Sequence, residues 1–215
     1  MPGALPLRIL LPALTAFATF AGAPAIASPP SATFSTFDPC LVVCPAGDIV
    51  FHTVIRDVGG NPIPNSLVVL DFSRCPMFVH CPGIPAPLIV NDAAHTIARF
   101  SDGAGAADFA IPMGGICPGS LVFVTASVSG GGGGVLLAMR SLASPDRDSN
   151  LSVDAADQAA VQALVGTTDA TADFNCDGAV TAADVAIVSQ HLTHLCAGPT
   201  PSRPRSWGKI KLIYR

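Results

Sequence analysis

The sequence predicts two folded parts, an all-β sandwich followed by a small all-α unit. Over residues 28–142, short runs of β-branched and aromatic residues alternate with turns that contain Gly and Pro. Over residues 143–198, two acidic loops are each followed by a helical pattern, which predicts helices at residues 155–165 and 182–195. Charged residues make up only 12% of the chain, and none of its 15 acidic residues is Glu. Such a composition suits short strands and turns better than long surface helices.

Residues 1–27 are expected to be a secretory signal peptide. Arg8 is their only charged residue, residues 9–22 are apolar, and Ala25-Ile26-Ala27 fits a small-x-small cleavage site. A membrane anchor is the alternative, but an apolar core of about 14 residues is short for a bilayer span of about 20. The sequence therefore predicts a secreted or cell-surface protein that is not transmembrane once the signal has been removed.

Within residues 28–142, six segments have the composition of strands. They are residues 49–55, 67–72, 95–100, 107–111, 121–128 and 135–139. Turn residues separate them, as at Gly59-Gly60-Asn61-Pro62 and Asp102-Gly103. Short strands with this punctuation predict a β-sandwich.

The sequence of these turns and of the strands beside them resembles bacterial immunoglobulin-like modules of the invasin/intimin kind. Residues 56–69, RDVGGNPIPNSLVV, are similar to the opening strands of such modules, and residues 101–109, SDGAGAADF, to their mid-domain turn. Residues 121–128, LVFVTASV, are similar to a late strand. The resemblance covers about half of the chain. It implies an immunoglobulin-like sandwich that acts as a spacer, an adhesion unit or a ligand-binding scaffold.

The second part contains two twelve-residue loops with oxygen-bearing residues at the spacing of an EF-hand loop. In the later loop the side-chain oxygens of Asp173, Asn175 and Asp177 can converge, and Gly178 suits the positive φ of a sharp turn. Asp184 closes that loop from the start of a helix. The same pattern occurs 27 residues earlier, where Asp146, Asp148, Asn150, Val153, Asp154 and Asp157 match Asp173, Asn175, Asp177, Val180, Thr181 and Asp184. Asx-turn helix caps without metal are the alternative, although caps do not need five oxygen-bearing residues in one loop.

These two loop–helix repeats resemble a type I dockerin, over residues 145 to about 196. The resemblance implies two Ca²⁺ sites and docking onto a cohesin-like partner domain. The implied ligands of the first site are Asp146, Asp148, Asn150, the Ser152 carbonyl and Asp157, with Asp154 acting through water. Those of the second are Asp173, Asn175, Asp177, the Ala179 carbonyl and Asp184, with Thr181 at the position of Asp154. The implied partner contacts are Ala155 and Ala156 in the first repeat and Ala182 and Ala183 in the second.

One departure from the dockerin pattern concerns the sharp turn of the first loop. Leu151 occupies the position that Gly178 occupies in the second loop. A non-Gly residue with positive φ is strained by about 1 kcal/mol or more. The second site is therefore expected to bind Ca²⁺ more tightly than the first.

The seven cysteines of an exported chain predict disulfides. Five of them, Cys40, Cys44, Cys75, Cys81 and Cys117, lie in the first part, where at least two disulfides are expected. Cys176 and Cys196 lie in the second part, and the odd total leaves at least one thiol unpaired or paired to another molecule. Zinc ligation is the alternative, but no C-x-x-C or H-x-x-x-H accompanies the cysteines. His191 and His194 could meet a metal from one helix, but a solvated helix end is the favoured interpretation.

Residues 199–215 carry five basic residues and no acidic one, together with the only Trp and the only Tyr of the chain. They are expected to be a disordered extension or an artefact of the reading frame, and binding to an anionic envelope surface is the alternative. Residues 28–198 are acidic, with 15 Asp against five Arg, and no nucleic-acid partner is expected.

The sequence offers no recognisable catalytic constellation. It contains no H-E-x-x-H, no G-x-S-x-G and no P-loop, and the Asp residues outside the acidic loops mostly lie beside turns. The expected function is therefore that of a secreted, non-catalytic, calcium-dependent interaction protein. The alternative is a component of extracellular polysaccharide degradation, through carbohydrate binding or glycoside hydrolysis. The lack of Trp and Tyr in residues 28–198 counts against a glycan-binding face.

Overall fold

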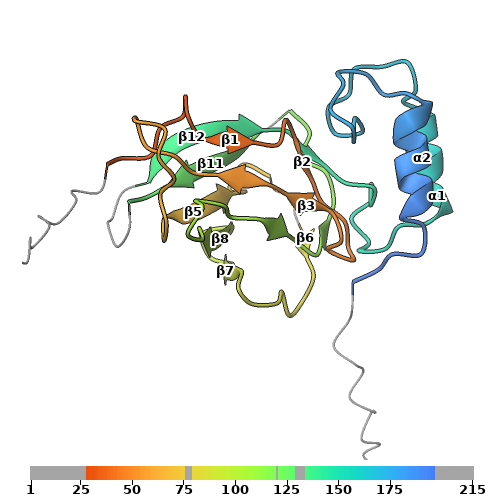
Figure 1. Ribbon diagram of the computed structural model, residues 1–215. Helices are drawn as coiled ribbons and strands as arrows, with labels where there is room; N and C mark the ends of the chain where they lie inside the picture. Colours follow the sequence, from red (N-terminus) through yellow and green to blue (C-terminus); the bar gives the residue numbers. More distant parts are fainter. Residues whose placement is uncertain (1–27, 76–78, 120, 129–133, 197–215) are drawn as a thin grey trace, which may run out of the picture.

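The computed structural model describes residues 28–75, 79–119, 121–128 and 134–196 (Figure 1). The expected signal peptide, the basic extension and the middle of the segment between Cys75 and Cys81 lie outside the described residues. The described chain is mostly β-structure, with thirteen short strands and two short helices. We call the described residues up to 142 the β-body and residues 143–196 the C-terminal segment.

A five-stranded antiparallel sheet forms one layer of the β-body. Its strand order is β12 (Val135–Arg140), β11 (Val122–Ala126), β5 (Leu67–Asp71), β8 (Thr96–Phe100) and β7 (Ile89–Asn91). Alternate side chains of the central strands are buried, among them Val68 and Leu70 of β5 and Val122 and Val124 of β11. This period of two is the one that the β-branched runs predict.

Short two-stranded pairs lie across one face of this sheet (Figure 1). The pairs are β1 (Thr36–Phe37) with β4 (Thr53–Val54), β3 (Val50–Phe51) with β9 (Phe109–Ala110), β10 (Met113–Gly114) with β6 (Val79–His80), and, in parallel, β13 (Leu142–Ala143) with β2 (Leu41–Val42). The main apolar core lies between the layers and includes Phe51, Phe109 and Met113 opposite Val68 and Ile97. The strand expected at residues 49–55 is interrupted at His52, so the second layer is a set of short pairs and not one continuous sheet.

The prediction of an all-α C-terminal unit is wrong. The C-terminal segment contains only α1 (Ala155–Gln162) and α2 (Ala182–Gln190), of eight and nine residues, and the remainder is loop and turn. Both helices begin where the sequence places them but end earlier than the expected residues 165 and 195. Twelve residues of each repeat form an acidic loop whose side chains bond to backbone amides, and such bonds compete with helix formation.

The C-terminal segment also shares its core with the β-body. A second buried cluster joins Val42 and Ala143 of the β2–β13 pair to Val161 of α1, Val188 of α2 and Phe174 of the second loop. The two helices lie side by side at one end of the β-body (Figure 1). Neither helix is long and apolar enough to span a bilayer, and no other helix occurs in the described residues.

Three disulfides are present, and two of them connect the β-body to the C-terminal segment. The two connecting disulfides are Cys40–Cys176 and Cys81–Cys196, with Cα–Cα distances of 6.0 and 5.4 Å. The third, Cys75–Cys117, lies within the β-body. The prediction of at least two disulfides within residues 28–142 is therefore wrong, because packing of the C-terminal segment supplies nearer partners. The prediction of an unpaired thiol is confirmed, since Cys44 is free and buried.

Candidate metal-binding sites

The first acidic loop brings three carboxylates together. Oxygens of Asp146, Asp148 and Asp157 lie within 4.8 Å of one another. Asp146 and Asp157 are buried and Asp148 is exposed. Carboxylates at such separations repel one another unless they are protonated or share a cation. The second loop carries Asp173, Asp177 and Asp184, but among the described residues these carboxylates do not approach one another as closely.

Both loops use the same hydrogen bonds to hold their carboxylates. The carboxylate at loop position one accepts the amide N–H groups of positions five and six. These pairs are Asp146 with Asn150 (3.2 Å) and Leu151 (2.9 Å), and Asp173 with Asp177 (3.1 Å) and Gly178 (2.8 Å). The carboxylate at position twelve accepts the amides of positions two and nine. These pairs are Asp157 with Arg147 (2.7 Å) and Asp154 (2.9 Å), and Asp184 with Phe174 (2.8 Å) and Thr181 (2.8 Å).

The side chains at positions three and five pair in both loops, but the amide that donates lies at position five in the first loop and at position three in the second. Asn150 donates its amide to Asp148 over 3.0 Å, and Asn175 donates to Asp177 over 2.8 Å. The residues at position seven, Ser152 and Ala179, each donate a backbone N–H to the side-chain oxygen at position five, over 2.8 and 3.0 Å. The predicted ligands at positions one, three, five and seven of each loop thus form one connected set.

The 27-residue repeat of the sequence is also a repeat of the backbone. Val153 of the first loop bonds to Thr193 (2.8 Å) and His194 (2.7 Å), which follow α2. Val180 of the second loop bonds in the equivalent way to Thr167 and Gly166, which follow α1, over 2.8 Å each. Each loop therefore pairs with the segment behind the other helix. Positive φ angles recur at the same interval, in Ser149 and Cys176, in Leu151 and Gly178, and in Gly166 and Thr193.

Position nine of each loop caps the following helix. The Asp154 side chain accepts the backbone N–H of Ala156 over 2.7 Å, and the Thr181 hydroxyl accepts that of Ala183 over 3.1 Å. These predicted ligands are placed as N-caps, each in a capping box with the Asp at position twelve. The four alanines predicted to contact a partner, Ala155, Ala156, Ala182 and Ala183, are exposed in the first turns of the two helices.

Burial and like charge act on the first loop. Burial, together with the nearby Asp157 and Asp148 carboxylates, raises the pKa of Asp146 to about 6 against the opposing effect of its amide hydrogen bonds. Burial also lowers the pKa of Arg147, whose guanidinium contacts Thr171 and lies 3.9 Å from Asp169. The loop therefore holds negative charge in a place where solvent stabilises it poorly.

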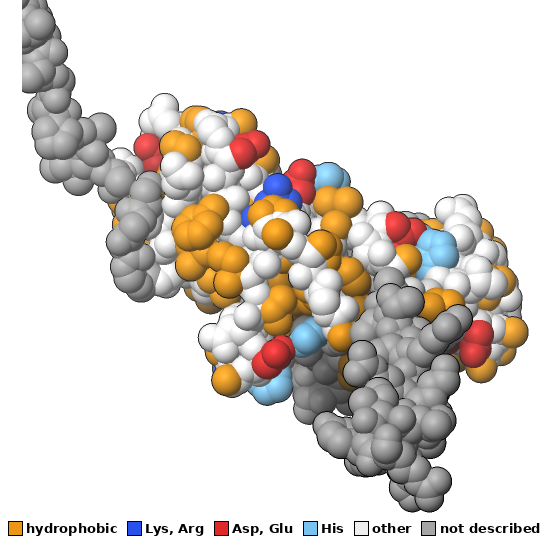
Figure 2. Space-filling model, turned by 90° about the horizontal axis from the view of Figure 1, so that it is seen from below, with side chains coloured by type: hydrophobic (Ala, Val, Ile, Leu, Met, Phe, Trp, Pro, Cys, Tyr) orange, Lys and Arg blue, Asp and Glu red, His pale blue; other side chains and the backbone are white. Residues whose placement is uncertain are grey.

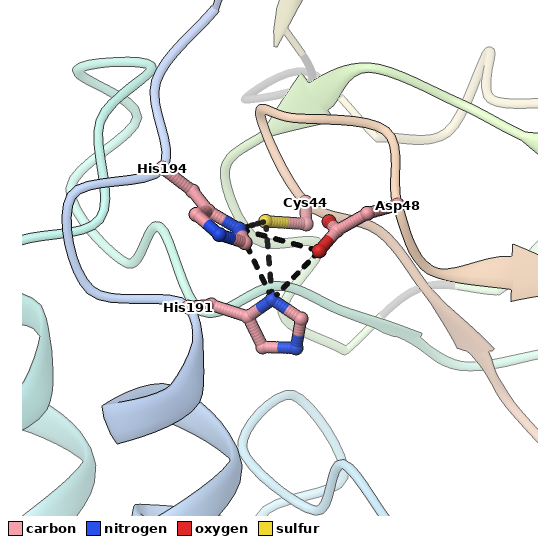
Figure 3. A group of neighbouring side chains, drawn as sticks. All are labelled: Cys44, Asp48, His191 and His194. Atoms are coloured by element: carbon pink, nitrogen blue, oxygen red, sulfur yellow. Dashed lines mark hydrogen bonds and ion pairs between the residues drawn. The ribbon is translucent and has the colours of Figure 1, made fainter.

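A second cluster joins the β-body to the end of α2. Cys44 and Asp48 follow β2, His191 caps α2, and His194 lies three residues further on (Figure 3). The two Nδ1 atoms are 3.2 Å apart, and they lie 3.2 Å (His191) and 3.4 Å (His194) from Asp48 Oδ2. Cys44 Sγ lies 3.9 Å from His191 Nδ1 and 3.5 Å from His194 Nδ1. Burial, followed by the charge of Asp48, raises the pKa of the Cys44 thiol to about 12.

The sequence contains both halves of this second cluster but not their association. Cys44 and Asp48 are four residues apart, and His191 and His194 are three apart, spacings at which two side chains can face one point. The halves are separated by more than one hundred residues. The favoured interpretation of the histidines as a solvated helix end is wrong, since their side chains are only 15% and 30% exposed.

Comparison of this chain with protein-family models, with curated proteins and with solved structures gives no match.

Proposed function

We propose that this protein is secreted and binds calcium in its two acidic loops, and that the loaded loops present the helices to another protein. The observation that carries the proposal is the pair of equivalent loops, in which the same backbone amides hold the same carboxylate positions. In the first loop three carboxylates already lie within 4.8 Å of one another. A calcium ion takes six to eight oxygen ligands and neutralises such a cluster.

Calcium would be held by the ring of loop oxygens. Positions one, three, five and twelve supply side chains, and position seven supplies a carbonyl, as in EF-hand loops. Asp154 and Thr181 stabilise the helix starts through their capping bonds. Binding would offset the cost of holding Asp146 and Asp157 buried and ionised near each other. The ion therefore stabilises the loop and, through it, the first turn of the helix.

The partner surface of this proposal lies on the first turns of α1 and α2. Ala155-Ala156 and Ala182-Ala183 are small, exposed and related by the 27-residue repeat. A cohesin-like β-sandwich could pack closely against either pair, so two docking orientations related by about 180° are expected from the pseudo-twofold arrangement. A protein partner is favoured over a glycan. Figure 2 shows apolar side chains spread over the visible face of the β-body, with few charged ones between them. Among the described residues, the exposed large aromatic side chains are Phe34 and Phe100.

Calcium binding is tested by calorimetry on the full chain after removal of metals. Two Ca²⁺ ions per chain are expected. Asp157→Ala and Asp184→Ala should each remove one site, because each deletes the carboxylate at position twelve. Asp102→Ala is the matched control, since Asp102 accepts backbone amides in a turn of the β-body, outside both loops. No calcium uptake, or the same stoichiometry in all three variants, contradicts the proposal.

Docking is tested by capturing partners from culture medium with and without Ca²⁺. Arg substitutions at Ala182 and Ala183 should leave binding largely intact, because the other repeat still offers its surface. Arg substitutions at all four alanines should abolish binding. A partner that binds equally without Ca²⁺, or to the four-fold variant, shows that docking uses another surface.

A further inference from the structure

We propose that Cys44, Asp48, His191 and His194 bind one Zn²⁺ ion in a closed tetrahedral site, which fastens the end of α2 to the β-body. The proposal does not depend on the calcium loops. It rests on the convergence of four different ligand side chains from two distant parts of the chain on a single point (Figure 3).

The side chains are of the kinds that zinc prefers. A thiolate, two imidazole nitrogens and a carboxylate oxygen form a mixed sulfur, nitrogen and oxygen set. Ca²⁺ and Mg²⁺ prefer sets made only of oxygen. This cluster therefore differs in chemistry from the acidic loops of the same protein, and the two kinds of site select different ions.

The distances between the ligand atoms are those of a tetrahedron. Zinc–ligand bonds of about 2.0–2.3 Å in tetrahedral geometry place neighbouring ligand atoms about 3.3–3.6 Å apart. The nitrogen–nitrogen and nitrogen–oxygen distances are 3.2, 3.2 and 3.4 Å. The two sulfur–nitrogen distances are 3.5 and 3.9 Å. Cys44 Sγ and the Asp48 carboxylate oxygen, the remaining pair, lie within 4.8 Å of each other. The ligand atoms are therefore spaced as those around one tetrahedral ion would be.

Hydrogen bonding alone explains the cluster poorly. If both Nδ1 atoms donate to Asp48, two N–H groups face each other across 3.2 Å. If one of them accepts instead, its lone pair points at the Asp48 carboxylate, which accepts only when it is ionised. A cation at the centre removes both conflicts, because every atom then directs a lone pair at positive charge.

Cysteine use supports the same conclusion. Six of the seven cysteines form disulfides, and the remaining one, Cys44, is fully buried. Its sulfur faces the two histidines and Asp48. A buried thiol with these neighbours is placed to ligate a metal and is shielded from other thiols.

The position of the site gives the ion a structural role. All four tetrahedral positions are taken by protein side chains, which leaves no open position for a substrate or a reactive water. His191 ends α2, and the His194 carbonyl accepts the amide of Val153 in the first loop. Cys44 is anchored by its carbonyl, which accepts the amides of Gly47 and Met113. The ion therefore connects the end of α2, and through His194 the first loop, to the part of the β-body that holds Cys44.

The test uses the full, disulfide-bonded chain, stripped of metals and then saturated with Ca²⁺ so that the acidic loops are occupied. Titration with Co²⁺ should give one equivalent of tetrahedral Co²⁺ with a sulfur-to-cobalt charge-transfer band. Zn²⁺ should displace it with the same stoichiometry. Cys44→Ser should abolish the charge-transfer band, and His194→Gln should weaken Zn²⁺ binding by at least about tenfold.

The matched control is His52→Gln, because His52 also faces a carboxylate, Asp108 at 3.0 Å, but lies outside the cluster. It should titrate like the unmodified chain. Asp48→Asn, on a partly exposed loop, replaces His194→Gln if that variant is not secreted. Octahedral Co²⁺ without a thiolate band, no zinc uptake beyond the calcium sites, or unchanged binding in the Cys44 and His194 variants overturns the proposal.

Discussion

Leu151 and Gly178 occupy the same turn of the two acidic loops with different backbone strain. Leu151 has a φ of 64° and Gly178 a φ of 93°. The positive φ that the first loop requires of Leu151 is thus present, and a leucine there is strained by about 1 kcal/mol. Leu151→Gly should raise the free energy of unfolding by about this amount. Urea denaturation of the calcium-loaded chain measures it.

Gly178→Ala provides the reciprocal experiment. Open space surrounds a Cβ at Gly178, so strain at positive φ is the expected effect there. This variant should lower the free energy of unfolding by about 1 kcal/mol. Calorimetry on both variants also tests whether the second site binds Ca²⁺ more tightly than the first. A destabilised Leu151→Gly chain would show that the leucine side chain contributes more through packing than it costs in strain.

Asp146 gives the metal-free protein a pH dependence of defined sign. Its pKa is raised to about 6 in the folded chain, above an unfolded value of about 3.9. A carboxyl with a raised pKa contributes stability below the unfolded value, and this contribution is lost as pH rises through about 6. Between pH of about 4 and about 7, metal-free protein should lose on the order of 2–3 kcal/mol through this group.

The comparison that isolates this effect is Asp146→Asn, which keeps the shape of the side chain but cannot ionise. Urea denaturation in metal-free buffer at several pH values should show a smaller loss for the variant than for the unmodified chain. Equal pH dependence of the two chains would show that Asp146 ionises as readily as an exposed carboxyl.

At the scale of elements, β10 packs directly against the first loop, where Gly114 contacts the Asp146 carboxylate. A Cβ built on Gly114 would lie 1.8 Å from Asp146 Oδ2, and the neighbouring Gly115 amide donates to the Asp146 carbonyl over 3.1 Å. Gly114→Ala should therefore displace the position-one carboxylate. We expect a loss of about 1–3 kcal/mol in stability, as for other overpacked sites, and weaker binding of one Ca²⁺ ion. Thermal unfolding and calcium calorimetry measure the two effects.

Gly103→Ala serves as the control for Gly114→Ala, because no heavy atom lies within 4 Å of a Cβ at that position. It should change neither stability nor calcium binding appreciably. If Gly114→Ala behaves like Gly103→Ala, the contact between β10 and the first loop does not set the position of Asp146.

The elements themselves were predictable to the extent that they are coded locally. The starts of α1 and α2 follow from N-cap residues and from Asp at position twelve, and both are confirmed. The helix ends were overestimated, because apolar residues such as Val165 and Leu195 continue the pattern where the chain turns away and leaves them exposed. The break at His52 was also missed, since a run of β-branched residues does not reveal where pairing partners change.

At the scale of the whole molecule, the contacts between distant segments could not be predicted. The acidic loops were recognisable because each lies within twelve consecutive residues. The cluster of Cys44, Asp48, His191 and His194 combines two short signals from opposite ends of the described chain. It forms only because the C-terminal segment packs against β2 and β13. Disulfide partners depend on the same packing, which is why pairing within the β-body was overestimated.

The last prediction concerns these connections. Cys40–Cys176 and Cys81–Cys196 close loops with sequence separations of 136 and 115 residues, much longer than the 42 of Cys75–Cys117. A disulfide that closes a long loop restricts the unfolded chain most. Replacing both Cys40 and Cys176 by Ser should therefore lower the free energy of unfolding by about 2–5 kcal/mol. Replacing Cys75 and Cys117 removes a disulfide that closes a shorter loop and should cost no more than this.

Peptide mapping under non-reducing conditions tests the connectivity that this prediction requires. Proteolysis of the unreduced chain should leave peptides of the C-terminal segment attached to the β-body through Cys40 and Cys81. One thiol, that of Cys44, should react with an alkylating reagent, and only after the chain has been unfolded, because the native side chain is buried. A Cys75–Cys81 bridge would instead close a local loop and leave Cys196 without its partner in the β-body. The C-terminal segment would then be held at that point by packing alone, and the second long loop would not restrict the unfolded chain.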